Sequence, residues 1–319
     1  MSVLILGSVN TDLVIRSPRL PRPGETVLGG EFYQAAGGKG ANQAVAAARS
    51  AGEHRKVTFI GAVGDDDYGC ESRRGLLAEG IDCSHLKEVT SVPSGIALIL
   101  VDEHGENLIS VASGANAHLL PSDVDALPAS LFQKSKVFLA CLESPLPTVE
   151  RGLTRAKEHG LMTLLNPAPV GDSAAVKKLL PLVDLLTPNE LELAALAGMT
   201  VETPDSAAAA ARIVQSLGAR HIIVTLGDAG SVVVDETGTA HHIPAFPVTP
   251  IDTTAAGDCF SGSLAVALAE GQPLFAAVRF ASAAAAISVT RRGAQPSLPR
   301  KEEIDSLLKG ANHPVKMIE

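Results

Sequence analysis

The chain has 319 residues, of which 46% are hydrophobic and 19% charged, a balance typical of an ordered globular protein rather than a disordered one. Its formal net charge of −9 argues against a surface for nucleic acid or anionic membrane, because those partners need a concentrated positive field. The four cysteines lie far apart with no C-x-x-C pair, which favours a reducing cytoplasm and predicts neither a zinc site nor a disulfide framework.

The chain opens on an apolar run, VLILG, which lacks a preceding positive region and is shorter than the core of a signal peptide, so we predict a first strand. Similar runs, bounded by turn residues, recur as VTFIG, KVFLA, MTLLN, VDLLT and HIIVTLG. Alanine-rich stretches with helical spacing separate them. Runs that are apolar on both faces indicate strands covered by helices on both sides, so the predicted fold class is α/β with a mostly parallel central sheet.

Two stretches, at about 12–36 and 94–112, break this alternation. The first is rich in proline and glycine, and the second predicts a hairpin that turns near His104 to Glu106. We expect the two insertions to form a small separate sheet that lies as a lid across the strand ends, where open α/β sheets bind ligands. Because no linker divides the sequence, we predict one domain over 1–319.

The stretch AAGGKGANQAVAAARSAG follows the first insertion and contains a glycine-rich turn. It fails the Walker A pattern, which needs Ser or Thr where Gly40 follows Lys39, and it fails the dinucleotide fingerprint because Gln43 occupies the third glycine position. A flexible turn over 37–40 remains, which lets backbone approach a ligand closely while Lys39 and Asn42 project from it. The alternative is a tight turn with a solvated lysine.

Farther along, we expect Thr203 to cap a helix that has Pro204 at its first position and ends at Gly218, before a strand at His221. The longest apolar-rich tract, 265–289, is interrupted by charged residues and a proline. It is therefore not expected to cross a bilayer as one helix.

Residues 251–264 read IDTTAAGDCFSGSL, a tight turn of small residues before a helix whose apolar positions recur every four residues from Phe260. Asp258 then falls in the first helical turn. The free backbone N–H groups from about Ala255 to Asp258, with the positive helix end, form a hole for the charge of a transferring phosphoryl group. The alternative is that Asp258 only favours the helix dipole while Asp252 caps the turn.

Together, GGKGANQA and DTTAAGDCFSGSL resemble the signatures of the ribokinase-type sugar kinase family, which also contains fructokinases and adenosine kinases. The resemblance extends over nearly the whole chain through GSVNTDLV, PRPGETV, GAVGDDDYG, PSGIALILVDEHGEN, TPNELE, VTLGDAG and VTRRGAQPSLP. It implies a three-layer α-β-α core with a small β-sheet lid that can pair with a second copy in a homodimer.

The resemblance also implies an activity, the ATP-dependent phosphorylation of D-ribose at its 5-hydroxyl, with Asp258 as the general base. The amides of Ala255, Ala256 and Gly257 would receive the developing charge, with Mg²⁺ bridging the phosphates. The implied sugar-binding residues are Asn10, Asp12, Gly38, Lys39, Asn42 and Glu143, together with Asp258.

For the nucleotide, the resemblance implies that Asn189 and Glu192 order magnesium and phosphates. The residues implied to hold the phosphates and nucleoside are Thr225, Leu226, Gly227, Asp228, Gly230 and Gly257. Ser282 stands where the family commonly places a histidine against the adenine, so the purine contact departs from the pattern.

A monovalent cation, usually potassium, is implied beside the anion hole. Asp252 and Thr254 match its first ligands, with carbonyls of Ser288, Arg291 and Gly293 and the hydroxyl of Ser297 completing the set. The alternative is a basic surface loop whose arginines lie in solvent.

Two other functions stay open. One is the same chemistry on 2-deoxyribose, another sugar or a nucleoside. Asn10 and Asp12 suit the 2-hydroxyl of ribose, and the few aromatic side chains disfavour a nucleoside. The other is a non-catalytic sugar-binding protein, which is disfavoured because the base and the glycine turn are both present.

Overall fold

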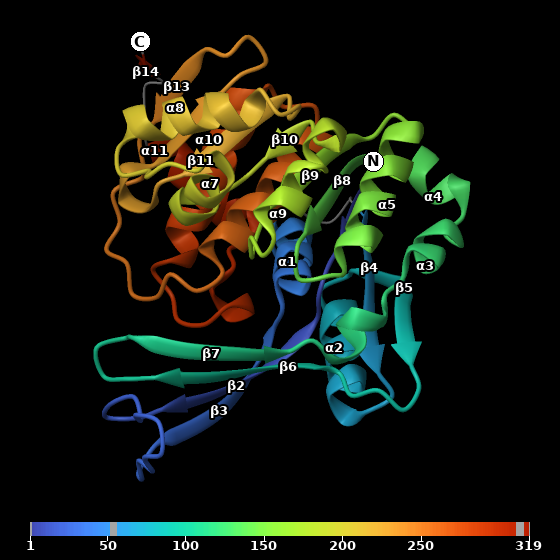
Figure 1. Cartoon of the computed structure of the whole chain (residues 1–319), viewed down its shortest axis with the longest axis vertical. Helices are drawn as coiled ribbons and strands as arrows, with labels where there is room; N and C mark the ends of the chain where they lie inside the picture. The colour runs from blue at the N-terminus through green and yellow to red at the C-terminus, as the bar shows by residue number, and fades with distance from the viewer. Residues whose placement is uncertain (1, 52–55, 311–315, 319) are drawn as a thin grey trace.

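The computed structural model describes residues 2–51, 56–310 and 316–318 (Figure 1). A large sheet contains β1 (Ser2–Leu6), β4 (Lys56–Gly64), β5 (Asp82–Val89), β8 (Ser135–Cys141), β9 (Met162–Asn166), β10 (Leu185–Leu186), β11 (His221–Thr225), β12 (Ser231–Val234), β13 (Ala240–Ile243) and β14 (Lys316–Ile318). A small sheet contains β2 (Asn10–Arg16), β3 (Glu31–Gly37), β6 (Gly95–Val101) and β7 (Asn107–Ala112).

The strand order of the large sheet is β14-β13-β12-β11-β10-β9-β8-β1-β4-β5. All neighbours from β5 to β11 pair in parallel, and β12, β13 and β14 pair antiparallel at one edge. The predicted, mostly parallel sheet is therefore confirmed. The VDLLT run contributes only the two residues of β10, Leu185 and Leu186.

The helices are α1 (Lys39–Ala51), α2 (Asp67–Ala78), α3 (Pro121–Asp125), α4 (Ala129–Gln133), α5 (Leu146–Glu158), α6 (Ser173–Lys177), α7 (Glu190–Ala197), α8 (Pro204–Gln215), α9 (Ala256–Ala269), α10 (Leu274–Ser288) and α11 (Lys301–Gly310). Short 3-10 turns are η1 (Gly114–His118), η2 (Leu180–Leu182), η3 (Gly227–Ala229) and η4 (Gln295–Ser297). Within the described ranges, no helix is long and apolar enough to span a bilayer. The four cysteines are free thiols.

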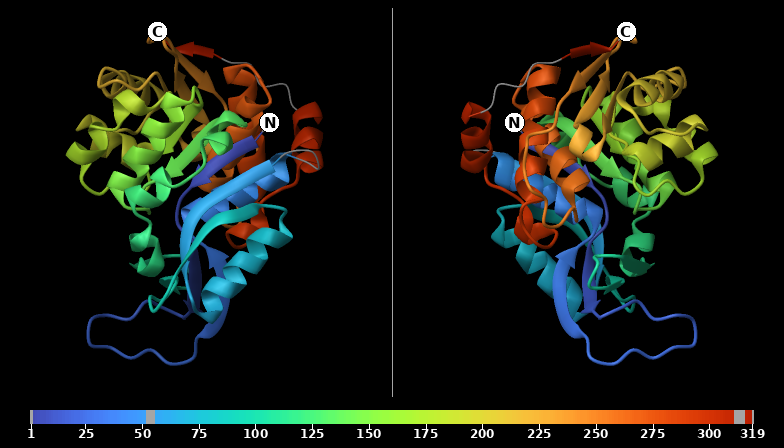
Figure 2. Two further views of the ribbon diagram at one scale, coloured as in Figure 1. Left: turned by 90° about the vertical axis from the view of Figure 1, so that its right-hand side faces the viewer. Right: turned by 90° about the vertical axis from the view of Figure 1, so that its left-hand side faces the viewer.

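The helices cover both faces of the large sheet (Figure 2). Side chains alternate along β1: Val3 and Ile5 pack with α1, α9 and α10, whereas Leu4 and Leu6 pack with α5 and other helices of the opposite layer. Both sides of a central strand are thus buried, as expected for a parallel sheet between helices. The three-layer α-β-α fold is confirmed.

Helix α8 begins as predicted, with Thr203 accepting from the Ser206 amide and Pro204 at the first position. Its predicted end at Gly218 was wrong, because the helix ends at Gln215 and Ser216 forms its C-cap. Gly218 lies in the turn that follows and adopts φ +123°, a conformation that favours glycine.

The small sheet has the order β3-β2-β6-β7 and lies below the large sheet in Figure 1. β2 pairs antiparallel with β3, and β6 antiparallel with β7, as expected for two insertions. β2 and β6 pair in parallel and join the two hairpins. Because β2 follows the carboxyl end of β1 after a link over 7–9, the small sheet continues from the edge where a parallel sheet binds ligands.

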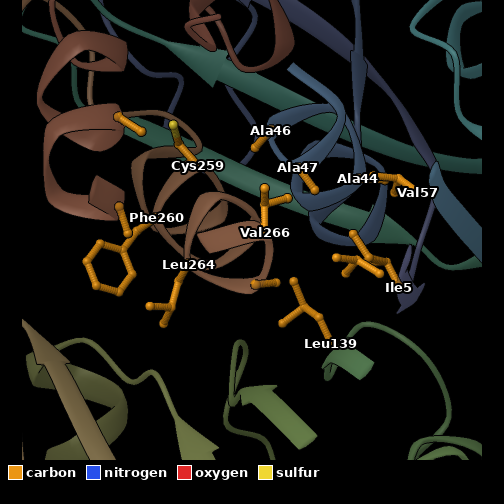
Figure 3. Close-up of a cluster of buried hydrophobic side chains, with 14 of the residues drawn as sticks. Ile5, Ala44, Ala46, Ala47, Val57, Leu139, Cys259, Phe260, Leu264 and Val266 are labelled. Carbon is orange, nitrogen blue, oxygen red and sulfur yellow. The ribbon is translucent and has the colours of Figure 1, made fainter. Parts of the chain in front are cut away.

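Helices α1 and α9 pack closely because the residues between them are small (Figure 3). Ala44, Ala46 and Ala47 on α1 are almost fully buried. A Cβ atom at Gly262 of α9 would lie 2.3 Å from the carbonyl oxygen of Gln43, so only glycine permits this approach. The glycine turn that opens α1 and the first turn of α9 are thereby brought together.

Candidate active site

The first turn of α9 carries Asp258, which is only 5% exposed. The residue that caps this helix, Ala255, has φ +60° and no side-chain cap. An alanine in this left-handed conformation costs roughly 1 kcal/mol, and such strain persists where the surrounding structure fixes the backbone. The sequence prediction that Asp258 lies in the first helical turn is confirmed.

The sequence predicts free backbone N–H groups from about Ala255 to Asp258, and the structure differs at one of them. The Ala256 amide is not free, because it donates to the Thr253 carbonyl at 3.2 Å. Within the described residues, the amides of Gly257 and Asp258 have no protein acceptor, as expected for the first turn of a helix. A Cβ atom at Gly257 would meet nothing within 4 Å, so open space lies beside these donors.

Both carboxylate oxygens of Asp258 accept hydrogen bonds from α1. Asn42 Nδ2 donates to Oδ2 and Gln43 Nε2 donates to Oδ1, each at 3.1 Å. Burial raises the pKa of Asp258, and the Glu143 charge adds to this, while Lys39 and the two amides oppose it. A carboxylate in such surroundings is a stronger proton acceptor than an exposed aspartate.

Lys39 is the cation in a cluster of carboxylates. The charge of Asp258, opposed by burial and supported by Glu143, raises the pKa of Lys39. Burial raises the pKa of Asp12 to about 7, with the charges of Glu143 and Asp258 adding to the shift. Glu143 does not cap the next helix: it accepts hydrogen bonds from the Ser8 hydroxyl and from the Lys39 amide. The predicted residues Asp12, Lys39, Glu143 and Asp258 are therefore close enough to perturb one another.

Asn10 and Gly38 also lie at this site. Gly38 has φ +86°, and a Cβ atom there would lie 2.6 Å from the Asn10 amide nitrogen, so the turn passes directly against the start of β2. Asn10 is buried, and its Oδ1 accepts from Asn116 Nδ2 at 2.9 Å. This contact leaves the Nδ2 of Asn10 as the group that can donate to a ligand.

A second group of predicted residues lies around α7. Asn189 and Glu192 form a capping box, with Glu192 donating its amide to Asn189 Oδ1 at 2.8 Å and Asn189 donating its amide to Glu192 Oε2 at 3.0 Å. Burial raises the pKa of Glu192, and the Asp258 charge adds to the shift. Asn189 also bridges to Thr225, where the turn 225–230 begins. That turn therefore lies beside Asn189.

Ser282, the predicted adenine contact, is on a different helix. It is half-buried on α10, and no hydrogen bond among the described residues links it to another predicted site residue.

The predicted cation residues lie in two segments, one just before α9 and one from the end of α10 to η4. Gly293 donates its amide to Asp252 Oδ2 at 2.8 Å, and Thr254 donates its amide and hydroxyl to Asp252 Oδ1 at 2.9 and 2.6 Å. Although burial raises it, these hydrogen bonds bring the pKa of Asp252 below its ordinary value. The Arg291 side chain pairs with Glu303 on α11 rather than lying free in solvent. The remaining members are both buried: Ser288 is the last residue of α10, and Ser297 ends η4.

A cavity of about 220 Å³ opens between the small sheet and α2. Its lining includes Asn10 and Gly37 but not Asp258 or Lys39. Asp12 and Glu143 do not line it either, so this cavity does not contain the predicted base.

Three buried side chains that orient the site residues were not predicted from the sequence: Gln43, Asn116 and Asn166. Gln43 was noted only as a mismatch to the dinucleotide fingerprint, although a glutamine among alanines on a buried helix is itself a signal. Asn116 lies in η1 and Asn166 is the last residue of β9, and neither stands in such a pattern.

Comparison with known proteins identifies the family. The pfkB family carbohydrate kinase pattern matches residues 1–301. A ribokinase from Haemophilus influenzae is 43% identical over 310 residues, covering 97% of this chain and 99% of the relative. A deoxyribokinase from Salmonella typhi is 37% identical, covering 97% and 99%. The structure of an Arabidopsis thaliana ribokinase complexed with ribose and ATP superposes with a TM-score of 0.87 at 31% identity, covering 96% of this chain and 98% of that one. The chain belongs to the pfkB family of carbohydrate kinases.

Proposed function

We propose that this protein transfers the γ-phosphoryl group of ATP to the 5-hydroxyl of D-ribose. The observation that carries the proposal is the buried Asp258 beside unpaired amides at the start of α9. The similarity to a ribokinase from Haemophilus influenzae and to a ribokinase complexed with ribose and ATP supports the two substrates.

In this reaction Asp258 takes the proton of the sugar 5-hydroxyl while the hydroxyl oxygen bonds to the γ-phosphorus. The bond from that phosphorus to the bridging oxygen breaks, and ADP leaves with the electron pair. The amides of Gly257 and Asp258 stabilise the charge on the transferring group, and Lys39 adds a positive charge nearby. Asn10, Asp12, Gly38, Asn42 and Glu143 would hold the sugar.

Mg²⁺, bound with ATP, neutralises the charge of the phosphates. Within the described residues no group of three or more His, Cys, Asp or Glu side chains could hold a metal ion. This fits Mg²⁺, which is commonly bound by one or two carboxylates, substrate phosphates and water. Asn189 and Glu192 are the proposed contacts, and Thr225 to Gly230, with Ser282, would contact the nucleotide.

The test is ADP release at fixed MgATP with D-ribose, 2-deoxyribose, fructose and adenosine. We expect the largest kcat/KM with ribose. The second candidate is 2-deoxyribose, favoured by the similarity to a deoxyribokinase. The 2-hydroxyl of ribose would pair with Asn10 and Asp12, whereas the deoxy sugar would leave one of these side chains without a partner, so the deoxy sugar is expected to bind less well. Equal or better turnover of another sugar would refute ribose as the preferred acceptor.

We also propose that potassium binds at Asp252, Thr254, Ser288, Arg291, Gly293 and Ser297 and activates the enzyme. Replacing K⁺ by Na⁺ or tetramethylammonium is expected to lower kcat/KM several-fold, and Asp252→Asn to remove the difference. Asp235→Asn is the matched control, because Asp235 Oδ1 accepts from the amide and hydroxyl of Thr237 in the same way at a distant turn. Turnover that does not depend on the cation would overturn this site.

A homodimer through the small sheet is the proposed assembly. The face opposite Asp12 carries an apolar row in register across the strands, with Phe32, Ile15 and Leu108 at 58%, 40% and 51% exposed. Such a face gains from burial against a second copy. We expect sedimentation equilibrium to give twice 32.8 kDa, and Leu108→Asp to give the monomer mass. The control is Leu191→Asp, at an exposed leucine on α7. A parent protein of monomer mass would exclude the dimer.

A further inference from the structure

Gln43 lies in the second turn of α1, is fully buried, and makes its hydrogen bonds to the side chains of two other elements. Its Nε2 donates to Asp258 Oδ1 on α9 and to Asn166 Oδ1 at the end of β9, both at 3.1 Å. A glutamine amide has two N–H groups, so both are used. The side chain therefore joins the proposed base to the carboxyl end of β9 in the large sheet.

The orientation of the Gln43 amide is fixed by its other partner, Asn166. Asn166 Nδ2 donates to the Thr187 carbonyl at 2.9 Å, and a backbone carbonyl can only accept. Asn166 must then turn its Oδ1 toward Gln43, which in turn must present its nitrogen. Reversing the Gln43 amide would place its oxygen against two acceptors. One backbone carbonyl after β10 thus decides that an N–H group, not a lone pair, faces Asp258.

Packing alone does not account for a glutamine at this position. The Gln43 Oε1 atom is buried and has no hydrogen-bond partner among the described residues. An unpaired buried carbonyl oxygen destabilises a fold, so if the side chain only filled space, an apolar residue of the same size would avoid this cost. The amide is thus placed where only its donor end makes hydrogen bonds.

We propose that Gln43 is a positioning residue for Asp258: its amide holds Oδ1 while Asn42 holds Oδ2, which fixes the plane of the carboxylate and favours its ionised form. This inference rests on the proposed function, in which Asp258 is the general base. Gln43 acts through Asp258, and Asn166 acts through Gln43.

Charged and titratable groups from every neighbouring element act on Asp258. They are Lys39 on α1, Asp12 on β2, Cys141 and Glu143 at and after β8, Glu192 on α7 and Cys259 on α9. Burial raises the pKa of both thiols to about 12, so they stay protonated near neutral pH. Lys39 stays charged because its pKa is raised. The pH profile of kcat at saturating sugar reports the groups that titrate in the loaded enzyme. Asp12 is a proposed sugar contact, so its own titration contributes less to that profile than it would in the free enzyme.

The test is the pH dependence of kcat for Gln43→Met at saturating ribose and MgATP. An N–H group that donates to a carboxylate stabilises the charged form, so its loss raises the pKa of the base. We expect kcat to fall about tenfold or more near neutral pH and the acidic limb to move up by about one pH unit, with the KM for ATP unchanged. Asn166→Ala, which releases the Gln43 amide, should produce a smaller shift in the same direction.

Ser263→Ala is the matched control. The Ser263 hydroxyl on α9 bonds to the Ser50 hydroxyl on α1 at 2.8 Å, so the variant also removes a buried hydrogen bond between these two helices. It does not touch Asp258, and we expect the parent pH profile whatever its melting temperature. If Gln43→Met and Asn166→Ala move the acidic limb no more than Ser263→Ala does, Gln43 is only a packing residue.

Asp258→Asn separates this inference from the function on which it rests. An Asp258→Asn enzyme as active on ribose as the parent would refute the proposed base itself. An inactive Asp258→Asn enzyme beside a Gln43→Met enzyme with the parent profile would refute only the role of Gln43. If Gln43→Met does not fold, Asn166→Ala alone decides, since an unmoved limb there contradicts the proposal.

Discussion

Replacing Asp258 with asparagine is expected to lower kcat by about 10²- to 10⁴-fold, the usual contribution of a general base. The change preserves the shape of the side chain and removes the proton acceptor. Because the reaction depends mainly on positioning and charge stabilisation, residual turnover should remain. The measurement is kcat from ADP release with ribose and MgATP, together with KM for both substrates.

The asparagine also introduces a donor where two donors already point. Asn42 and Gln43 both direct N–H groups at this side chain, so the new amide nitrogen meets one of them. The melting temperature of Asp258→Asn should therefore be measured beside its activity, and Ser263→Ala serves as a folded control. A kcat within a few-fold of the parent would remove Asp258 from the reaction.

Gly37→Ala is expected to raise the KM for ribose and to lower kcat/KM by about 10- to 100-fold, the effect of losing hydrogen bonds to a charged group. A Cβ atom at Gly37 would lie 2.2 Å from Oδ1 and 2.3 Å from Oδ2 of Asp12. The carboxylate is the free end of its side chain, so it can rotate away with little effect on the fold. Steady-state kinetics with ribose and with ATP varied in turn measure the change, and the KM for ATP should be unchanged.

Gly75→Ala is the control for this substitution. Gly75 lines the same cavity from α2, but a Cβ atom there meets nothing within 4 Å. Alanine in a helix is favourable, so this variant should keep the parent kinetics and melt slightly higher. Equal kinetics for the two variants would show that the Asp12 carboxylate does not bind the sugar.

The sequence predicted those parts of the fold that depend on local pattern. Apolar runs located the parallel strands, and Thr203 with Pro204 located the start of α8, because strand burial and helix capping act over a few residues. The end of α8 was missed because Gly218 belongs to the following turn. The use of the Ala256 amide was missed because it depends on how Thr253 folds back.

The site was predicted to the extent that its motifs carry recognisable residues. Asp258 and the glycine turn are conspicuous in the sequence. Gln43 became visible only in the structure, because it acts on a residue 215 positions away across the α1–α9 contact. That contact depends on a glycine and several alanines. Small residues permit close packing, but their sequence does not indicate which helix packs against them.

The parallel pairing of β2 with β6 bears on the order of assembly. It joins residues 10–16 to 95–101, so the pair closes a long loop that includes β4, α2 and β5, and such non-local pairings form slowly. Asn10 and Asp12 reach their final places only when this pair forms. During refolding from denaturant, the return of helical circular dichroism should therefore precede the return of phosphotransfer, and a stalled chain would display the row of Phe32, Ile15 and Leu108 to other chains.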